Sequence, residues 1–220
     1  MQRGIFISGI GTEIGKTVIA ALITQALDAD YWKPVQSGDL SCSDTMKVKT
    51  WVSHPAAIFH PEVFRLNTPA SPHYSAELDG VQIKVTDFKL PQTNNFLVAE
   101  GAGGLMVPLN QSETMVDLIK HLGLPVVLVS QNYLGSINHT LLSLQCLQQH
   151  GIPLAGLIFN GPAVPSTTDI IERMGGQKAL FHLPPLAEIN QAVIADWAEK
   201  VKPILQKEFF SKNSADESVR

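Results

Sequence analysis

Cysteine is scarce in this sequence. Among its 220 residues only Cys42 and Cys146 are cysteines, and they lie far apart in the chain. Neither belongs to a C-x-x-C pair or to a metal-ligand spacing, so the pattern argues against both a disulfide framework and a structural zinc site. Reduced thiols of this kind are typical of the cytoplasm, and we expect the protein in that compartment.

Positive charge and long hydrophobic runs are scarce as well. The chain has 16 Lys and Arg against 20 Asp and Glu, which gives a formal net charge of −4. Nucleic acids and anionic membranes are bound by clustered positive charge, so the composition predicts neither as a partner. No stretch approaches the ~20 consecutive apolar residues that would span a bilayer.

The length suits one α/β domain, because no change of composition along residues 1–220 marks a second. We therefore predict a single domain. The polar stretch at about 208–220 is expected to be a disordered tail.

Short apolar runs alternate with amphipathic segments of helical length. A parallel twisted sheet with helices on both faces accounts for strands that are apolar on both sides, and its binding site belongs at the carboxyl ends of the strands. Between 53 and 95 the periodicity is poor, and we expect an irregular excursion with a helix near Ser75. The predicted strands are residues 5–9, 31–35, 96–100, 126–130, 154–160 and 179–183, and the predicted helices are 16–29, 44–52, 114–122, 136–150, 167–174 and 190–207.

The stretch GIGTEIGKT at 9–17 follows the first predicted strand. Its end matches a phosphate-binding loop, but the G-x-x-x-x-G-K-[ST] pattern requires glycine at position 10, where Ile10 stands. Gly15 permits close approach to a phosphate, Lys16 supplies a cation, and Thr17 offers a hydroxyl to Mg²⁺. A glycine-containing turn is the alternative, but the position between a buried strand and a helix favours a nucleotide site.

A Mg²⁺-nucleotide site also needs carboxylates from neighbouring strand ends. Glu100 ends the strand FLVAE and precedes a glycine-rich turn, so we expect it to bind metal. Asp44 alone fits an N-cap better than a ligand. In KPVQSGD, Lys33 and Ser37 fit either an anion site or a solvated turn, with no preference from this stretch alone.

Six motifs of the sequence together resemble, in order, those of the dethiobiotin synthetase family of biotin biosynthesis. They are GIGTEIGKT, KPVQSG, SDT, TPASPH, EGAGGLMVPL and LGSINH. That family's loop carries the same extra residue before G-K-T, so the loop at 9–17 is intact. The resemblance covers roughly residues 4–187. It implies a single P-loop NTPase-like domain and a homodimer.

The resemblance also implies a ligase reaction. The family uses MgATP to join CO₂ to 7,8-diaminopelargonate and closes the ureido ring of dethiobiotin. One amine forms a carbamate with CO₂, ATP phosphorylates the carbamate, and the second amine expels phosphate from the mixed anhydride. Such chemistry depends on positioning and on fixed positive charge.

Carried over by position, Lys33 and Lys16 are the catalytic residues implied, and Asp44 becomes a metal ligand rather than a cap. The substrate carboxylate would be bound at LGSINH across the dimer interface, and His139 is expected to be structural because the chemistry needs no imidazole. The nucleotide-binding set implied is Glu13, Ile14, Gly15, Lys16, Thr17, Val18, Asp44, Glu100, Gly101, Ala102, Gly103, Asn160, Gly161, Pro184, Pro185 and Leu186. The substrate-binding set implied is Thr12, Lys33, Ser37, Gly135, Ser136, Ile137 and Asn138, and the metal ligands implied are Thr17, Asp44 and Glu100.

Three features depart from the family pattern. Gly11 replaces a residue that is polar in many relatives, and the link at 81–95 is short for the helix expected there. Asn160 precedes Gly161-Pro162, which leaves the choice of nucleobase open.

Two rival functions use the same loop. A cobyrinic-acid-type amidase would need a glutaminase with a nucleophilic cysteine, for which the chain has no motif. A partitioning ATPase would need DNA- or membrane-binding surfaces, which the acidic composition does not offer.

Overall fold

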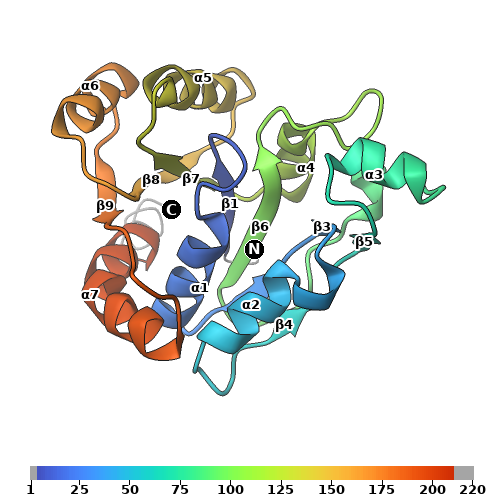
Figure 1. Cartoon of the computed structure of the whole chain (residues 1–220), viewed down its shortest axis with the longest axis horizontal. Helices are drawn as coiled ribbons and strands as arrows, with labels where there is room; N and C mark the ends of the chain where they lie inside the picture. Colours follow the sequence, from blue (N-terminus) through green and yellow to red (C-terminus); the bar gives the residue numbers. More distant parts are fainter. Residues whose placement is uncertain (1–3, 211–220) are drawn as a thin grey trace, which may run out of the picture.

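The computed structural model describes residues 4–210. Its centre is a seven-stranded sheet in the order β4-β2-β6-β1-β7-β8-β9, in which every neighbouring pair is parallel (Figure 1). The strands are β1 Gly4–Gly9, β2 Asp30–Trp32, β4 Phe59–His60, β6 Leu97–Gly104, β7 Val126–Gln131, β8 Leu154–Asn160 and β9 Ala179–Leu183. The predicted α/β fold with a parallel sheet is confirmed.

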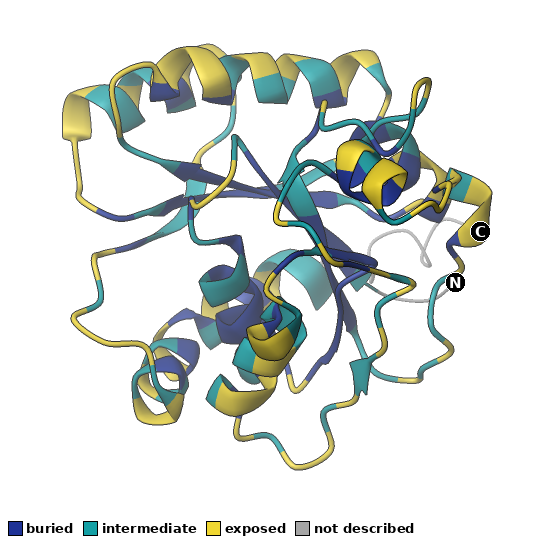
Figure 2. Ribbon diagram, turned by 45° about the vertical axis from the view of Figure 1, so that its right-hand side comes forward, coloured by how far each residue is buried: buried dark blue, intermediate teal, exposed yellow. Residues whose placement is uncertain are grey.

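Helices cover both faces of this sheet. On one face α1, α2 and α7 pack against alternate strand residues such as Ile5 and Ile7, and on the other α3, α4, α5 and α6 pack against Phe6 and its neighbours. Figure 2 shows the buried sheet between helices whose outer sides are exposed. The helices are α1 Lys16–Ala26, α2 Asp44–Trp51, α3 Pro72–Leu78, α4 Met115–Leu122, α5 Ser136–Gln149, α6 Pro165–Gly175 and α7 Gln191–Phe210.

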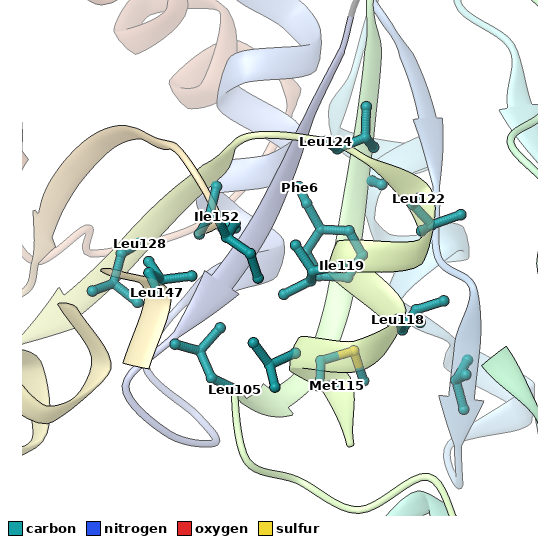
Figure 3. Packing of buried hydrophobic residues seen from close by; sticks show 14 of the residues in the cluster. Phe6, Leu105, Met115, Leu118, Ile119, Leu122, Leu124, Leu128, Leu147 and Ile152 are labelled. Carbon is teal, nitrogen blue, oxygen red and sulfur yellow. The ribbon is translucent and has the colours of Figure 1, made fainter. Parts of the chain in front are cut away.

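The alternation along β1 explains this two-sided core. Phe6 is fully buried and points toward Ile119 of α4, with Met115 and Leu105 nearby (Figure 3). Because successive strand residues face opposite sides, one apolar strand contributes to both helical layers.

The second predicted strand, 31–35, is two strands. β2 ends at Trp32, and β3 Val35–Ser37 leaves the main sheet to pair in parallel with β5 Phe64–Leu66. Pro34 has no N–H for the ladder and restricts the residue before it, so the strand breaks there.

The stretch from 53 to 95 is more regular than predicted. It contains β4, β5 and the expected helix around Ser75, and strands of two or three residues are too short to show a period in sequence. Its other end carries only a 3₁₀ turn, Val85–Asp87, between α3 and β6, so the short link expected at 81–95 indeed lacks an α-helix. Ile83 and Phe88 are fully buried and anchor that link to the core.

A buried carboxylate ties this excursion to the sheet edge. Asp30 accepts hydrogen bonds from Asn95 Nδ2 at 2.9 Å, Thr93 Oγ1 at 2.5 Å and the backbone N–H of Ile58 at 3.0 Å. Burial raises the pKa of Asp30, but these bonds outweigh it and hold the pKa below its ordinary value.

Helix α7 continues into the stretch expected to be a tail. It ends at Phe210, and Phe209 and Phe210 pack their rings against Phe96 at centroid distances of 5.8 and 5.4 Å. The predicted boundary near 208 is therefore too early, and the rest of that stretch lies outside the described residues. Cys42 and Cys146 are free thiols, as the pattern predicts. Between residues 4 and 210, none of the helices has the length and apolar character needed to cross a membrane.

Candidate active site

The phosphate-binding loop connects β1 to α1. Gly15 adopts φ +86°, and a Cβ at this position would lie 2.1 Å from Asn160 Nδ2. Asn160 Nδ2 in turn donates to the Ile14 carbonyl at 3.0 Å, so the end of β8 is hydrogen-bonded to the loop. Glycine is needed at 15 for two reasons, its backbone conformation and the amide packed against it.

Lys16 is held inside the curve of this loop. It is only 7% exposed, and its Nζ donates to the Gly11 carbonyl at 2.7 Å. Burial, together with the nearby Lys33 ammonium, lowers the pKa of Lys16 to about 8, although Glu100 and Asp44 partly offset this. A buried cation with a lowered pKa is a group that an incoming polyanion would stabilise.

Glu100 lies at the centre of the site. It is 1% exposed, and its Oε1 accepts from Thr17 Oγ1 at 2.9 Å and from Lys33 Nζ at 2.9 Å. The strand pairs Ile7–Glu100 and Trp32–Ala99 explain the meeting, because they align the carboxyl ends of β1, β6 and β2. The expected convergence of these three side chains is present.

Asp44 joins the same cluster through Lys33. The Lys33 Nζ to Asp44 Oδ2 distance is 2.8 Å, and Lys33 also donates to the Gly101 carbonyl at 3.1 Å. Burial would lower the pKa of Lys33, but the Glu100 and Asp44 carboxylates outweigh it and raise the pKa. Burial likewise raises the pKa of Asp44, and Lys33 reverses this and lowers it below its ordinary value.

Asp44 does not cap helix α2. The N-cap is Ser43, whose Oγ accepts from the Met46 backbone N–H at 3.3 Å, and Asp44 is the first helical residue. The alternative that the sequence alone favoured, Asp44 as the cap, is thus wrong. Its carboxylate is free to serve the site.

The chemistry of Thr17, Asp44 and Glu100 fits Mg²⁺. All three offer oxygen, and Mg²⁺ is usually held by one or two carboxylates plus substrate phosphates. Within residues 4–210 no group of three or more His, Cys, Asp and Glu side chains could hold a metal.

The sequence did not single out Tyr31 or Gln36. Tyr31 OH donates to Glu100 Oε2 at 2.8 Å, and burial together with Glu100 raises its pKa well above the ordinary value, so the phenol remains a donor. Gln36 Oε1 accepts from the Asp44 N–H at 3.1 Å, while Gln36 Nε2 donates to Gly38 O at 3.0 Å. The signal for Tyr31 was its place two residues before Lys33, in the strand β2 that ends just before that lysine.

Ser37 and Thr12 are predicted, beside Lys33, to contact the reacting end of the substrate. Ser37 Oγ is buried and has no hydrogen-bond partner among the described residues. Thr12 is exposed, and a Cβ at Gly103, whose φ is +67°, would lie 3.6 Å from Thr12 Oγ1. The turn expected after Glu100 is wrong, because β6 continues to Gly104, and this end of the strand runs alongside the phosphate-binding loop.

The residues predicted to surround the base lie at the ends of β8 and β9, where Asn160 pairs with Leu183. Pro184 and Pro185 are exposed and Leu186 is half-buried. Since the Asn160 amide is bonded to Ile14 O, it would have to leave that bond to read a base, and this role stays a prediction.

Helix α5 begins at Ser136 after Gly135, whose φ is +102°, and no side chain caps its first turn. Ser136 is buried and its Oγ has no hydrogen-bond partner within residues 4–210, whereas Ile137 and Asn138 are exposed. Tyr133 OH and His139 Nδ1 share a hydrogen bond of 2.8 Å, in agreement with a structural His139.

Two hollows flank this turn of α5. A hollow of about 550 Å³ separates the phosphate-binding loop, at Thr12 and Glu13, from Tyr133 and His139. Asn138 lines a different hollow of about 650 Å³ between α5 and α6. Within one chain, Asn138 and the phosphate-binding loop therefore face different spaces.

Comparisons with known proteins agree with this geometry. A family model described as an AAA domain matches residues 3–193. The ATP-dependent dethiobiotin synthetase BioD of Christiangramia forsetii is 48% identical, with 92% of this chain and 97% of the relative covered. The protein of the same name from Cytophaga hutchinsonii is 44% identical, with coverages of 89% and 95%. The chain belongs to the ATP-dependent dethiobiotin synthetase family. The expected ligase of biotin biosynthesis, with an ATP-binding P-loop, is confirmed at the level of this family.

Solved structures of low identity show the fold alone. A putative plasmid partition protein of Borrelia burgdorferi, bound to AMPPNP, has a TM-score of 0.58 at 13% identity and covers 96% of this chain and 100% of its own. MinD in a MinC:MinD complex of Aquifex aeolicus has a TM-score of 0.56 at 12% identity, with coverages of 91% and 96%. The P-loop NTPase-like architecture of this synthetase-family chain is confirmed by them.

Proposed function

We propose that this chain joins CO₂ to 7,8-diaminopelargonate and closes the ring of dethiobiotin, with conversion of MgATP to ADP and phosphate. The observation that carries the proposal is the buried cluster in which Lys33 bonds both Glu100 and Asp44, beside Lys16 in the phosphate-binding loop. Two neighbouring lysines suit a reaction that develops negative charge on two neighbouring groups, the phosphoryl and the carbamate.

Lys16 binds the phosphoryl group that is transferred. To do so its ammonium exchanges the Gly11 carbonyl for phosphate oxygens, and the first-turn N–H groups of α1 add their positive end. Thr17, Asp44 and Glu100 would hold Mg²⁺, which when bound neutralises charge on the phosphates. The Tyr31 phenol donates to Glu100 Oε2, so the carboxylate keeps one orientation.

Lys33 and the Ser37 hydroxyl serve the carbamate. One amine of the substrate attacks CO₂ and loses a proton, which leaves a carbamate anion that an ammonium and a hydroxyl can bind. The carbamate oxygen then attacks the γ-phosphorus of ATP and ADP leaves. Attack by the second amine on the resulting carbamic-phosphoric anhydride closes the ring and releases phosphate. Ser37 Oγ, buried and unpaired, is ready to donate.

A homodimer completes the site in this proposal. Around the start of α5 lie exposed apolar side chains, with Tyr133 at 42%, Leu134 at 103% and Ile137 at 37%. Apolar residues gathered at one place on a surface favour an interface. A second copy seated there would bring its Gly135–Asn138 turn, with an uncapped helix N-terminus, to the carboxylate of the substrate. We place the protein in the cytoplasm, in line with its two free thiols.

The test is release of ADP by the purified protein with each reactant omitted in turn. The proposal expects ADP only when diaminopelargonate and bicarbonate are both present. ADP formed without them, and stimulated by DNA or by anionic lipid vesicles, would contradict it and support a partitioning ATPase. ADP formed only with a glutamine donor would favour the amidase.

A further inference from the structure

The Lys33 ammonium occupies the space between the two carboxylates proposed as metal ligands. Its Nζ lies 2.9 Å from Glu100 Oε1 and 2.8 Å from Asp44 Oδ2. The same Glu100 oxygen accepts the Thr17 hydroxyl at 2.9 Å. The Lys33 ammonium therefore already contacts two of the three proposed metal ligands, Glu100 and Asp44. It also shares Glu100 Oε1 with the third, Thr17.

Charge and space both prevent a second cation from joining it there. Mg²⁺ lies about 2.1 Å from its oxygen ligands, so an ion bound to Glu100 Oε1 and Asp44 Oδ2 would fill the volume that Lys33 Nζ fills. Two cations at such a separation in a buried site would also repel each other strongly.

Burial explains why a cation is needed when the metal is absent. Glu100 is 1% exposed and Lys33 is 4% exposed, so water hardly solvates either charge. A buried carboxylate without a partner is strongly destabilising. The Gly101 carbonyl, at 3.1 Å, accepts a further hydrogen bond from Lys33 and fixes it in place.

We propose that Lys33 is a placeholder cation: it holds the metal-binding carboxylates together before the metal arrives, and divalent-cation binding displaces its ammonium toward the substrate. This inference rests on the metal ligands of the proposed function. It adds an order of assembly, because Lys33 becomes available for the carbamate only once the divalent cation has taken its two carboxylates.

Direct binding of Mn²⁺ without nucleotide, followed by electron paramagnetic resonance, tests the proposal. Lys33→Met should bind Mn²⁺ about ten-fold or more tightly than the unchanged protein, although it loses synthesis. Two controls remove other cations near the same carboxylates. Lys47, 3.4 Å from Asp44 Oδ1 on the exposed side, and Lys16, which bonds Gly11 O instead, should change affinity no more than about three-fold when replaced by Met.

The outcomes separate this proposal from the proposed function. If Lys33→Met and Lys16→Met bound Mn²⁺ more tightly by the same factor, the gain would come from removing any nearby positive charge, and the placeholder proposal would be overturned. The ADP assay on the unchanged protein would still test the proposed reaction. A gain that survives addition of Asp44→Asn to Lys33→Met would place the metal elsewhere and overturn it too.

A second measurement avoids the variant, should Lys33→Met fail to fold. In protein with ¹⁵N-labelled lysine side chains, a buried and hydrogen-bonded ammonium is shielded from exchange with water and gives its own signal, assigned to Lys33 by its loss in Lys33→Arg. Saturating Mg²⁺ should shift or abolish that signal. A signal that remains unchanged at saturation would overturn the proposal.

Discussion

At the scale of single residues, the site is a set of buried charges that neutralise one another. Glu100 and Asp44 share Lys33, whereas the hydrogen-bond partner of Lys16 within residues 4–210 is a backbone carbonyl, that of Gly11. Burial lowers the pKa of Lys16, whereas the bonded Glu100 and Asp44 carboxylates outweigh burial at Lys33 and raise its pKa. The two lysines are therefore predicted to respond differently to substitution.

Replacement of Lys16 by alanine should abolish synthesis while the fold persists. Loss of one preorganised donor at a centre of charge development lowers the rate by ~10²–10³. ADP release measured with saturating diaminopelargonate, bicarbonate and MgATP checks this, and circular dichroism confirms the fold. ADP production near the normal rate would reduce GIGTEIGKT to a turn.

Lys16 should also make stability depend on pH in an unusual direction. Its pKa falls from an ordinary 10.5 to about 8 in the folded protein, so between these values the unfolded state binds more protons. Stability contributed by this group therefore rises with pH across that window, and below about pH 8 the folded protein carries the full penalty.

In nucleotide-free protein at pH 7, Lys16→Met should raise the free energy of unfolding, by up to roughly 3 kcal/mol less the lost hydrogen bond to Gly11. Urea titrations at pH 7 and at pH 10 measure the difference, which should shrink at the higher pH. A variant less stable than the unchanged protein at pH 7, with a gap that does not depend on pH, would show that burial of this charge has no cost.

Asp44 and Ser43 allow the ligand and the cap to be tested separately. Asp44→Asn should raise the Mg²⁺ concentration needed for ADP release by about ten-fold, because a charged ligand becomes neutral. It should cost about 1–2 kcal/mol of stability, since Lys33 retains Glu100.

Ser43→Ala is the matched control for that substitution. It removes the cap of α2, so stability should fall by about 1 kcal/mol while the Mg²⁺ titration stays unchanged. An unaltered Mg²⁺ titration in Asp44→Asn would show that Asp44 is not a metal ligand.

At the scale of elements, prediction succeeded where the pattern was long. β1, β7 and β8 were recognisable because each is a run of apolar residues followed by a helix. This alternation predicts parallel strands, whose carboxyl ends meet at one edge of the sheet. β4 and β5 were missed because strands of two and three residues owe their existence to partners elsewhere in the chain. Glu100, Thr17 and Lys33 could be placed at one edge from sequence, but the bonds of Tyr31 and Gln36 depend on packing that no local pattern encodes.

The phosphate-binding loop gives an element-scale prediction. Gly15→Ala should abolish nucleotide binding, because the φ of +86° disfavours a side chain and its Cβ would meet Asn160 at 2.1 Å. Gly11→Ala is the control, since a Cβ there meets none of the described residues within 4 Å. Fluorescent nucleotide titration should give an affinity within about three-fold of the unchanged protein for Gly11→Ala. Retained binding in Gly15→Ala would mean that the loop tolerates a different path.

At the scale of the whole molecule, the open question is which chain supplies each end of the substrate site. Lys16 and Lys33 lie at the strand ends, whereas Asn138 lines the hollow between α5 and α6 of the same chain. Diaminopelargonate is long, with its carboxylate remote from both amines, so its two ends need not contact one subunit. A C₂ dimer would repeat the arrangement twice.

Mixing two inactive variants tests this arrangement. If Lys16 of one chain and Asn138 of the other serve one site, a heterodimer of Lys16→Ala and Asn138→Ala keeps one whole site and one doubly damaged site. Random exchange makes about half of the dimers mixed, so roughly a quarter of normal activity should return. The measurement is ADP release before and after subunit exchange, with each variant alone under the same treatment as the control. If both residues instead served the site of their own chain, every site in the mixture would lack one of them. No activity would then return. That result would contradict a site shared between the two chains and would not bear on the phosphoryl chemistry.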